Sequence, residues 1–135
     1  MLIYDTMKRK KVEFVPIEKN KIKMYVCGQT TYDYCHLGHA RKEIVFDTIR
    51  RWFIASGYEV IYIENITDID DKIIARSREQ NQNIEQFTNK YIEFMHEDFN
   101  KLGIMKPDFE PRATQYINEM IKIIENLIKK GFAYQ

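Results

Sequence analysis

The residues of this sequence that could do chemistry gather in one polar stretch at positions 27–41. His36 and His39 flank a Leu-Gly pair, and Gly38 has no side chain to keep a flat base or ribose away from the backbone. Two imidazoles three residues apart at a helix start can both donate hydrogen bonds to one phosphate. The pattern predicts stabilisation of charge on an α-phosphate while pyrophosphate is displaced.

Other interpretations of the histidine pair stay open on the residues alone. A His-x-x-His pattern also describes two capping or solvated surface histidines. The stretch is neither a P-loop nor a Gly-x-Gly-x-x-Gly dinucleotide fingerprint, and nothing in it suggests covalent attack. Its position after a strand-like run and before an amphipathic helix favours work on a phosphate.

The elements that must position the histidines follow a strand, loop, helix, strand order. Residues 23–26 form a short β-type run, and residues 58–63 form a second. Between them, apolar residues recur at helical spacing up to Gly57, a natural helix stop: Val45, Phe46, Ile49, Trp52 and Phe53. This order predicts one βαβ unit of a parallel sheet. The loop then lies where open α/β sheets bind ligands, because backbone N–H groups and the helix dipole converge on an anion there.

A second polar loop, Asn-Ile-Thr-Asp at positions 65–68, follows the second strand. It is expected beside the first loop, at the same edge of the sheet. The Asn65 amide and the Thr67 hydroxyl are suited to an amino group, a carboxylate or a ribose. Alternatively, Asn65, Thr67 and Asp68 only cap the helix that starts near Asp70. The charged residues at 70–72 are interpreted mainly as first-turn helix charge.

The rest of the chain is expected to be scaffold. Residues 2–4 and 12–15 predict a small hairpin whose basic turn, at 8–11, is solvated or touches RNA. Asn83 and Gln86 resemble a capping box that opens a helix running to Leu102. A last helix is expected to bury one apolar side: Ile117, Met120, Ile121, Ile124, Leu127 and Ile128. His96 is interpreted as structural or solvated, and residues 132–135 as the start of another strand.

Composition excludes several classes of protein. With 135 residues, 44% hydrophobic and 30% charged, the chain is typical of one soluble globular core. A net charge of +1 gives no general basic surface for nucleic acid. No apolar run is long enough to span a bilayer, and no signal peptide is recognisable. Two cysteines do not make a disulfide framework, so a cytoplasmic protein is expected.

Several linked motifs together resemble one family. Residues 24–28 (Met-Tyr-Val-Cys-Gly), 32–33 (Tyr-Asp), 36–41 (His-Leu-Gly-His-Ala-Arg), 65–73 (Asn-Ile-Thr-Asp-Ile-Asp-Asp-Lys-Ile) and 110–114 (Glu-Pro-Arg-Ala-Thr) resemble the N-terminal part of bacterial cysteinyl-tRNA synthetases, which are class I aminoacyl-tRNA synthetases. The resemblance implies an α/β fold, the N-terminal half of a Rossmann-like nucleotide-binding domain. Its segments would be an N-terminal hairpin at 1–20, a βαβ core with active-site loops at 21–80, and a helical segment at 81–135. The chain is then expected to be an N-terminal fragment, inactive alone.

The resemblance also implies roles for individual residues. His36 and His39 would be catalytic and would bind ATP together with Gly38. The cysteine or adenylate side would be lined by Cys27, Gly28, Thr30, Asn65 and Thr67. On the residues alone Cys27 is more simply a small buried strand-end residue, but the resemblance makes it a zinc ligand, with the other ligands outside this chain. Cys35 is expected to be packing. ATP with Mg, L-cysteine and tRNA(Cys) would be the substrates of a monomer that does not bind membranes.

Three positions depart from the family pattern. They are Gln29, Thr31 and Lys42, and the lysine replaces a hydroxyl expected near the nucleotide. Three other functions stay open: a ligase joining cysteine to an aminosugar for mycothiol synthesis, a small-molecule nucleotidyltransferase of the His-x-Gly-His type, and a non-catalytic nucleotide-binding module. Cys27 and the loop at 65–68 separate the synthetase-like readings from the nucleotidyltransferase.

Overall fold

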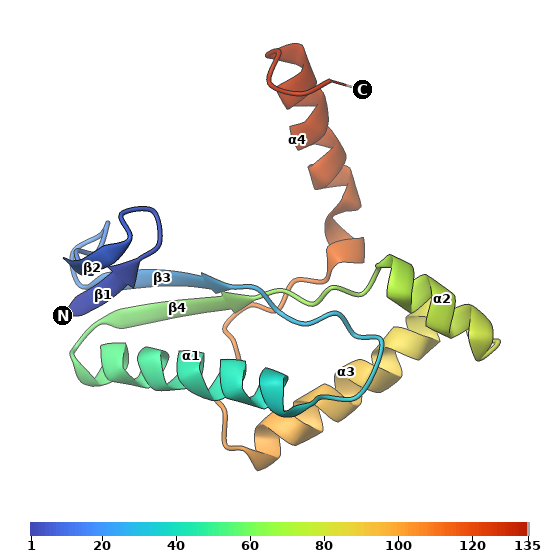
Figure 1. Cartoon of the computed structure of the whole chain (residues 1–135), viewed down its shortest axis with the longest axis horizontal. Coiled ribbons are helices and arrows are strands. Elements are labelled where there is room, and N and C mark those ends of the chain that lie inside the picture. Colours follow the sequence, from blue (N-terminus) through green and yellow to red (C-terminus); the bar gives the residue numbers. More distant parts are fainter. Residues whose placement is uncertain (135) are drawn as a thin grey trace.

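The computed structural model describes residues 1–134 as a hairpin, a parallel strand pair and a set of helices (Figure 1). Strands β1 (Leu2–Asp5) and β2 (Lys10–Glu13) form the hairpin, and β3 (Lys21–Val26) pairs in parallel with β4 (Glu59–Glu64). The helices are α1 (Leu37–Ala55), α2 (Asp71–Glu79), α3 (Ile84–Lys101) and α4 (Ile117–Lys129), the last preceded by a 3₁₀ turn at Ala113–Tyr116. The predicted α/β class, hairpin and βαβ unit are confirmed.

The parallel pair sets the direction of the whole unit. Strands β3 and β4 run in the same direction toward α2, and α1 connects them along one face (Figure 1). The pairing continues beyond both strands, because Thr30 lies opposite Thr67. A third extended segment adds to the other side of β4, where Phe109 pairs with Ile63 and Arg112 with Ile66, both in parallel. The polar loops after β3 and β4 therefore meet at one edge of the sheet, as the sequence predicts.

Helix α1 begins and ends where the sequence indicates, but it buries less than expected. His36 is its N-cap, and Gly57 follows its end with a φ of +87°, a conformation that favours glycine. Phe53 is 3% exposed and packs against Phe14, with ring centroids 5.0 Å apart and the rings tilted by 39°. Trp52 shares the helical spacing of the apolar residues but is 60% exposed. One face of α1 packs on the sheet. How many apolar side chains that face buries is decided by the tertiary packing and not by their spacing along the sequence.

Two small apolar clusters join α3 to the rest of the chain. One contains Ile66, Ile92 and Met95, with Cys35 packed against it, so the interpretation of Cys35 as packing is confirmed. The second cluster contains Ile73, Phe87 and Tyr91, against which Tyr32 packs. The predicted N-cap of α3 is also confirmed, since the Asn83 side chain accepts from the Glu85 N–H at 2.8 Å. These clusters fix the loop after β3 against α2 and α3.

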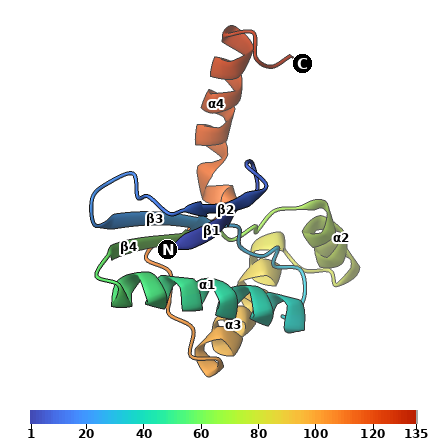
Figure 2. The same ribbon diagram turned by 60° about the vertical axis from the view of Figure 1, so that its left-hand side comes forward.

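The prediction that α4 buries its apolar side is wrong. All six stripe residues are at least 40% exposed, and Figures 1 and 2 show the helix standing away from the sheet and from α1, α2 and α3. Helical periodicity shows that a helix has an apolar face, but it does not tell what covers that face. Residues 132–134, expected to begin a strand, are not in one, and Gln135 lies outside the described residues.

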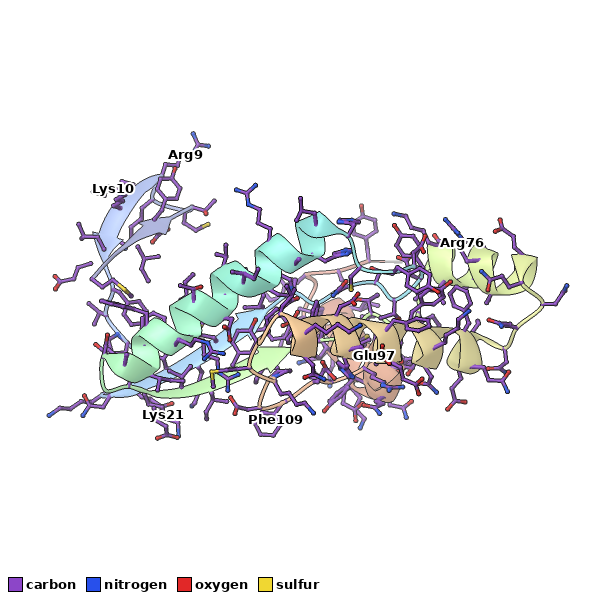
Figure 3. The ribbon with its side chains drawn as sticks, turned by 90° about the horizontal axis from the view of Figure 1, so that it is seen from below. Arg9, Lys10, Lys21, Arg76, Glu97 and Phe109 are labelled. Carbon is purple, nitrogen blue, oxygen red and sulfur yellow. The ribbon has the colours of Figure 1, made fainter. Side chains whose placement is uncertain are left out.

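The hairpin turn and His96 also belong to the scaffold. Arg9, with a φ of +53°, and Lys10 lie at the hairpin, at the opposite end of the molecule from Arg76 on α2 (Figure 3). His96 is structural, because its Nε2 lies 2.8 Å from Glu110 Oε2 and so links α3 to the segment beside β4. None of the described helices is both long and apolar enough to cross a membrane.

Candidate active site

A cavity of about 400 Å³ opens at the carboxyl end of β3, between the first loop, the start of α1 and the start of α2. It brings together four residues predicted from the sequence: Cys27, Gly28, Thr30 and His39. The other residues that line it are Gln29, Tyr32, Lys42 and Lys72. The sheet edge therefore collects residues of the first loop, the first turns of α1 and the first turn of α2, as a βαβ unit followed by a helix allows.

The two histidines form the capping box of α1. His36 Nδ1 accepts a hydrogen bond from the Gly38 N–H at 3.0 Å, and His39 Nδ1 accepts from the His36 N–H at 3.2 Å. The rings stack with centroids 3.8 Å apart. Because each Nδ1 is an acceptor, the ring hydrogen of each neutral imidazole sits on Nε2. The capping interpretation and the phosphate interpretation are thus compatible: one nitrogen caps the helix, and the other can donate to a ligand.

His39 is held in its neutral form. Partial burial lowers the pKa of His39, and the neighbouring His36 and Lys42 lower it further. Only His39 lines the cavity, while His36 is exposed beside it. Gly38 permits this arrangement, since a Cβ there would come within 2.8 Å of His36 Cε1 and 3.0 Å of His36 Nδ1. The lack of a side chain at Gly38 therefore serves the histidine cap, whatever it also allows a ligand to do.

Gly28 is a point of close backbone approach. A Cβ at this position would overlap the carbonyl oxygen of Asn65 and lie 2.7 Å from its carbonyl carbon. The Gly28 N–H donates to Asn65 Oδ1 at 3.0 Å, and the Tyr25 hydroxyl donates to the same oxygen at 2.9 Å. The Asn65 amide also donates to Thr67 Oγ1 at 3.3 Å. The Asn65 side chain is thus engaged in joining the two strand ends.

The second loop is not the cap of α2. Asp70 caps that helix, its Oδ1 accepting from the Lys72 N–H at 2.9 Å. Asp68 instead accepts from the Thr114 N–H at 2.9 Å and from its hydroxyl at 2.6 Å. Thr67 bonds across to the first loop through its backbone, accepting from the Thr31 N–H at 3.1 Å. Neither Asn65 nor Thr67 lines the cavity with Cys27, although both bond to the first loop, which does.

Lys42 lies between the cavity and a buried acidic pair. Its Nζ contacts the carboxylates of Glu43 and Glu64 and donates to the Cys27 carbonyl at 3.2 Å. Burial, with a smaller contribution from Glu64, raises the pKa of Glu43 to about 7, although Lys42 opposes the shift. The Tyr62 hydroxyl donates to Glu64 Oε2 at 3.1 Å, and burial followed by the charge of Glu64 raises the pKa of Tyr62. The ammonium group of Lys42 is therefore paired with Glu43 and Glu64 within the protein.

Cys27 is exposed at the mouth of the cavity, not buried as its strand-end position would indicate. Within residues 1–134, no group of three or more His, Cys, Asp and Glu side chains is placed to hold a metal ion. An accessible thiol at a substrate-sized cavity suits a metal ligand that also faces a substrate.

Three residues of the cavity wall are not predicted as site residues from the sequence: Gln29, Tyr32 and Lys72. The sequence indicates Gln29 only as a departure from the family pattern, Tyr32 only as part of a motif, and Lys72 only as helix charge. A usable signal was present: Lys72 follows the second strand-end loop, and the topology brings both loops to one edge.

Two parallel strands joined by a helix, with the first strand-end loop forming a histidine cap and a cavity, define an α/β domain whose candidate site lies at the carboxyl ends of its strands. Among solved structures, a LeuRS of Agrobacterium radiobacter, in a ternary complex with tRNA and LeuAMS, has this fold. The match has a TM-score of 0.73 and 25% sequence identity, over 89% of this chain and 16% of that one.

Residues 13–135 match the family described as tRNA synthetases class I (C) catalytic domain, and the chain belongs to this family. It is 59% identical over 133 residues to the Cysteine–tRNA ligase of Dechloromonas aromatica and 56% identical to that of Cupriavidus necator. Each match covers 98% of this chain, which spans 29% of the length of these relatives. The predicted family resemblance is confirmed.

Proposed function

We propose that this chain is the N-terminal part of the catalytic domain of a cysteine–tRNA ligase. The observation that carries the proposal is the meeting of His39 and Cys27 at one cavity: a neutral hydrogen-bond donor suited to phosphate beside a thiol suited to a metal. The identity of 55–59% to Cysteine–tRNA ligases over nearly the whole chain supports it. The proposal places the reaction in the cytoplasm, with the protein acting as a monomer on ATP with Mg, L-cysteine and tRNA(Cys).

In the first step, a carboxylate oxygen of cysteine attacks the α-phosphorus of ATP, the bond to the β-phosphate oxygen breaks, and pyrophosphate leaves. Negative charge grows on the α-phosphate oxygens. His36 and His39 donate from Nε2 to these oxygens, and their capped Nδ1 atoms fix the ring orientation beforehand. Gly38 leaves the backbone open beneath the adenosine. In the second step, a terminal ribose hydroxyl of tRNA attacks the carbonyl carbon of the adenylate, and AMP leaves with the bonding electrons.

The amino-acid side of the site is assigned to Cys27, Gly28, Thr30, Asn65 and Thr67. Thr30 would contact the substrate directly from the cavity wall. Asn65 and Thr67 would act by holding the two strand ends together, since Asn65 Oδ1 accepts from the Gly28 N–H and the Thr67 carbonyl accepts from the Thr31 N–H. This division of labour refines the sequence prediction, which gave all five residues contact with cysteine or adenylate.

Zinc fits this proposal through Cys27. A thiolate is a preferred zinc ligand, and Cys27 is exposed where the substrate side chain would lie. The remaining ligands are assigned to the part of the protein outside this chain. When bound, the metal would hold the thiolate of substrate cysteine, which separates cysteine from serine better than pocket size does.

The test is single-turnover kinetics on the full-length protein with His39→Asn. We expect a fall of about 10²–10³ in the rate of cysteine-dependent adenylate formation with little change in the KM for ATP, since the histidine acts mostly in the transition state. Transfer from preformed adenylate to tRNA should change much less.

His96→Asn is the matched control, since this histidine pairs with Glu110 and does not line the cavity. If the His39→Asn enzyme loses ATP affinity but forms adenylate normally at saturating ATP, His39 contributes only to ATP binding or to folding and not to the transition state. ATP–pyrophosphate exchange by the full-length protein that does not depend on cysteine would contradict cysteine as the substrate.

A further inference from the structure

Two lysines line the candidate active-site cavity, and their surroundings differ. Lys42 is partly buried, its ammonium group lies against the carboxylates of Glu43 and Glu64, and it also donates to a backbone carbonyl. Two carboxylates beside one ammonium group leave little positive charge for a ligand. Lys42 therefore supports the wall of the cavity and does not supply its charge.

Lys72 lines the same cavity from the first turn of α2 and is exposed. Its ammonium nitrogen is 5.2 Å from the centroid of the Tyr32 ring. That ring is held in place because it packs on the cluster of Ile73, Phe87 and Tyr91. A cation over an aromatic face gains orientation and modest energy but keeps its full charge.

The nearby carboxylate of the loop is already in use. Asp33 pairs with Arg76, one turn further along α2, at 3.5 Å; Figure 3 labels Arg76 on this helix. Among residues 1–134, no carboxylate forms an ion pair with Lys72. The tyrosine face therefore positions Lys72 while leaving its ammonium group free to meet a further partner.

The chemistry of the cavity defines that partner. Within the described part of the chain, none of the residues lining the cavity is acidic, and the wall carries the neutral donor His39, the hydroxyl of Thr30 and the ammonium group of Lys72. Positive charge without acidic residues in the cavity wall favours binding of an anion. Several hydrogen-bond donors lining a cavity of about 400 Å³ suit an oxyanion such as phosphate.

We propose that Lys72 binds a phosphate oxygen of the ATP in this cavity, which His39 also lines. The inference rests on the proposed function, which puts ATP here, and adds a residue that sequence reasoning assigned only to the helix terminus. The lysine acts as a charge, so it contributes to binding of any nucleotide that carries phosphate and not to binding of the nucleoside.

The experiment measures the affinity of the full-length protein for ATP and for adenosine, and adenosine is also tested as an inhibitor of cysteine-dependent ATP–pyrophosphate exchange. Lys72→Gln is expected to weaken ATP binding about 10-fold, the usual effect of losing one charge-assisted hydrogen bond. Adenosine binding should be unchanged, and Lys72→Arg should restore most of the ATP affinity. Lys90→Gln is the matched control: its ammonium group lies 5.4 Å from the Tyr91 ring centroid, but on α3 and outside the cavity.

Each other outcome overturns the inference. Equal losses for ATP and adenosine in Lys72→Gln would make the lysine a support for the Tyr32 loop. Normal ATP affinity with a slower transfer to tRNA would assign it to the nucleic acid. If Lys72→Gln behaves like Lys90→Gln in an active enzyme, the inference fails and the proposed function stands. If the unaltered protein neither binds ATP nor supports exchange, both fail.

Discussion

Replacing Gly28 with alanine tests the geometry on which the whole site depends. The added Cβ would overlap the Asn65 carbonyl, which is backbone and cannot rotate away. The ends of β3 and β4 must then separate by roughly 1–2 Å to restore ordinary contact distances. No conformational penalty is involved, because Gly28 does not have a positive φ.

The magnitude follows from what the separation breaks. Three backbone N–H groups donate hydrogen bonds across this junction: Gly28 N–H to Asn65 Oδ1 at 3.0 Å, Thr67 N–H to Gln29 O at 3.0 Å, and Thr31 N–H to Thr67 O at 3.1 Å. Each is worth about 1 kcal/mol net, and overpacking itself costs about 1–3 kcal/mol. We expect Gly28→Ala to destabilise the junction by about 4–6 kcal/mol, a large share of the roughly 5–15 kcal/mol that holds a typical domain.

Native-state hydrogen exchange of the Thr31 and Thr67 amides in the full-length protein measures this effect locally. Gly103→Ala is the control, since a Cβ there meets nothing within 4 Å and only the φ of +70° is unfavourable, at about 1 kcal/mol. If Gly28→Ala increases exchange of these two amides no more than Gly103→Ala does, the close approach of the strand ends is wrong. Adenylate formation should fall in parallel, because Cys27 and Thr30 move with the loop.

Three further predictions concern the protonation of Glu43, zinc binding by Cys27 and the activity of residues 1–135 alone. The folded protein holds a proton on Glu43, with its pKa near 7, that the unfolded chain, near 4.5, releases. The stabilisation of the folded state by this bound proton is complete below about pH 4.5 and is lost as the pH rises through 7. Between pH 5 and pH 8 the unfolding free energy should therefore fall less in Glu43→Gln than in the unaltered protein, by up to about 3 kcal/mol. Denaturant titrations at the two pH values measure this difference. Cys27→Ser should remove zinc from the full-length protein by elemental analysis while Cys35→Ser retains it, and residues 1–135 alone should not keep a stoichiometric zinc through dialysis. The isolated chain should give no cysteine-dependent ATP–pyrophosphate exchange above its His39→Ala variant; clear exchange would show that this part of the domain suffices.

Features that depend on neighbours along the chain were predictable from the sequence. The hairpin, the strand–helix–strand order, the stop at Gly57 and the cap at Asn83 all follow from bonds and steric preferences that act over a few residues. The placing of both loops at one sheet edge was also predictable, because parallel strands joined by a helix have their carboxyl ends on the same side. The position of His39 at the cavity follows from that topology and from the spacing of the histidine pair.

The choice of partners across the fold was decided only by the tertiary structure. Lys42 could face a phosphate on sequence grounds, but Glu64, 22 positions away, lies close enough to hold it. Gly28 was assigned to ligand contact, yet its missing side chain makes room for Asn65. The apolar stripe of α4 is the clearest difference, since its spacing is correct and its burial is not. Periodicity and residue type give the face that a helix or loop presents, but what meets that face depends on which distant segment the packing brings there, and no local preference encodes that.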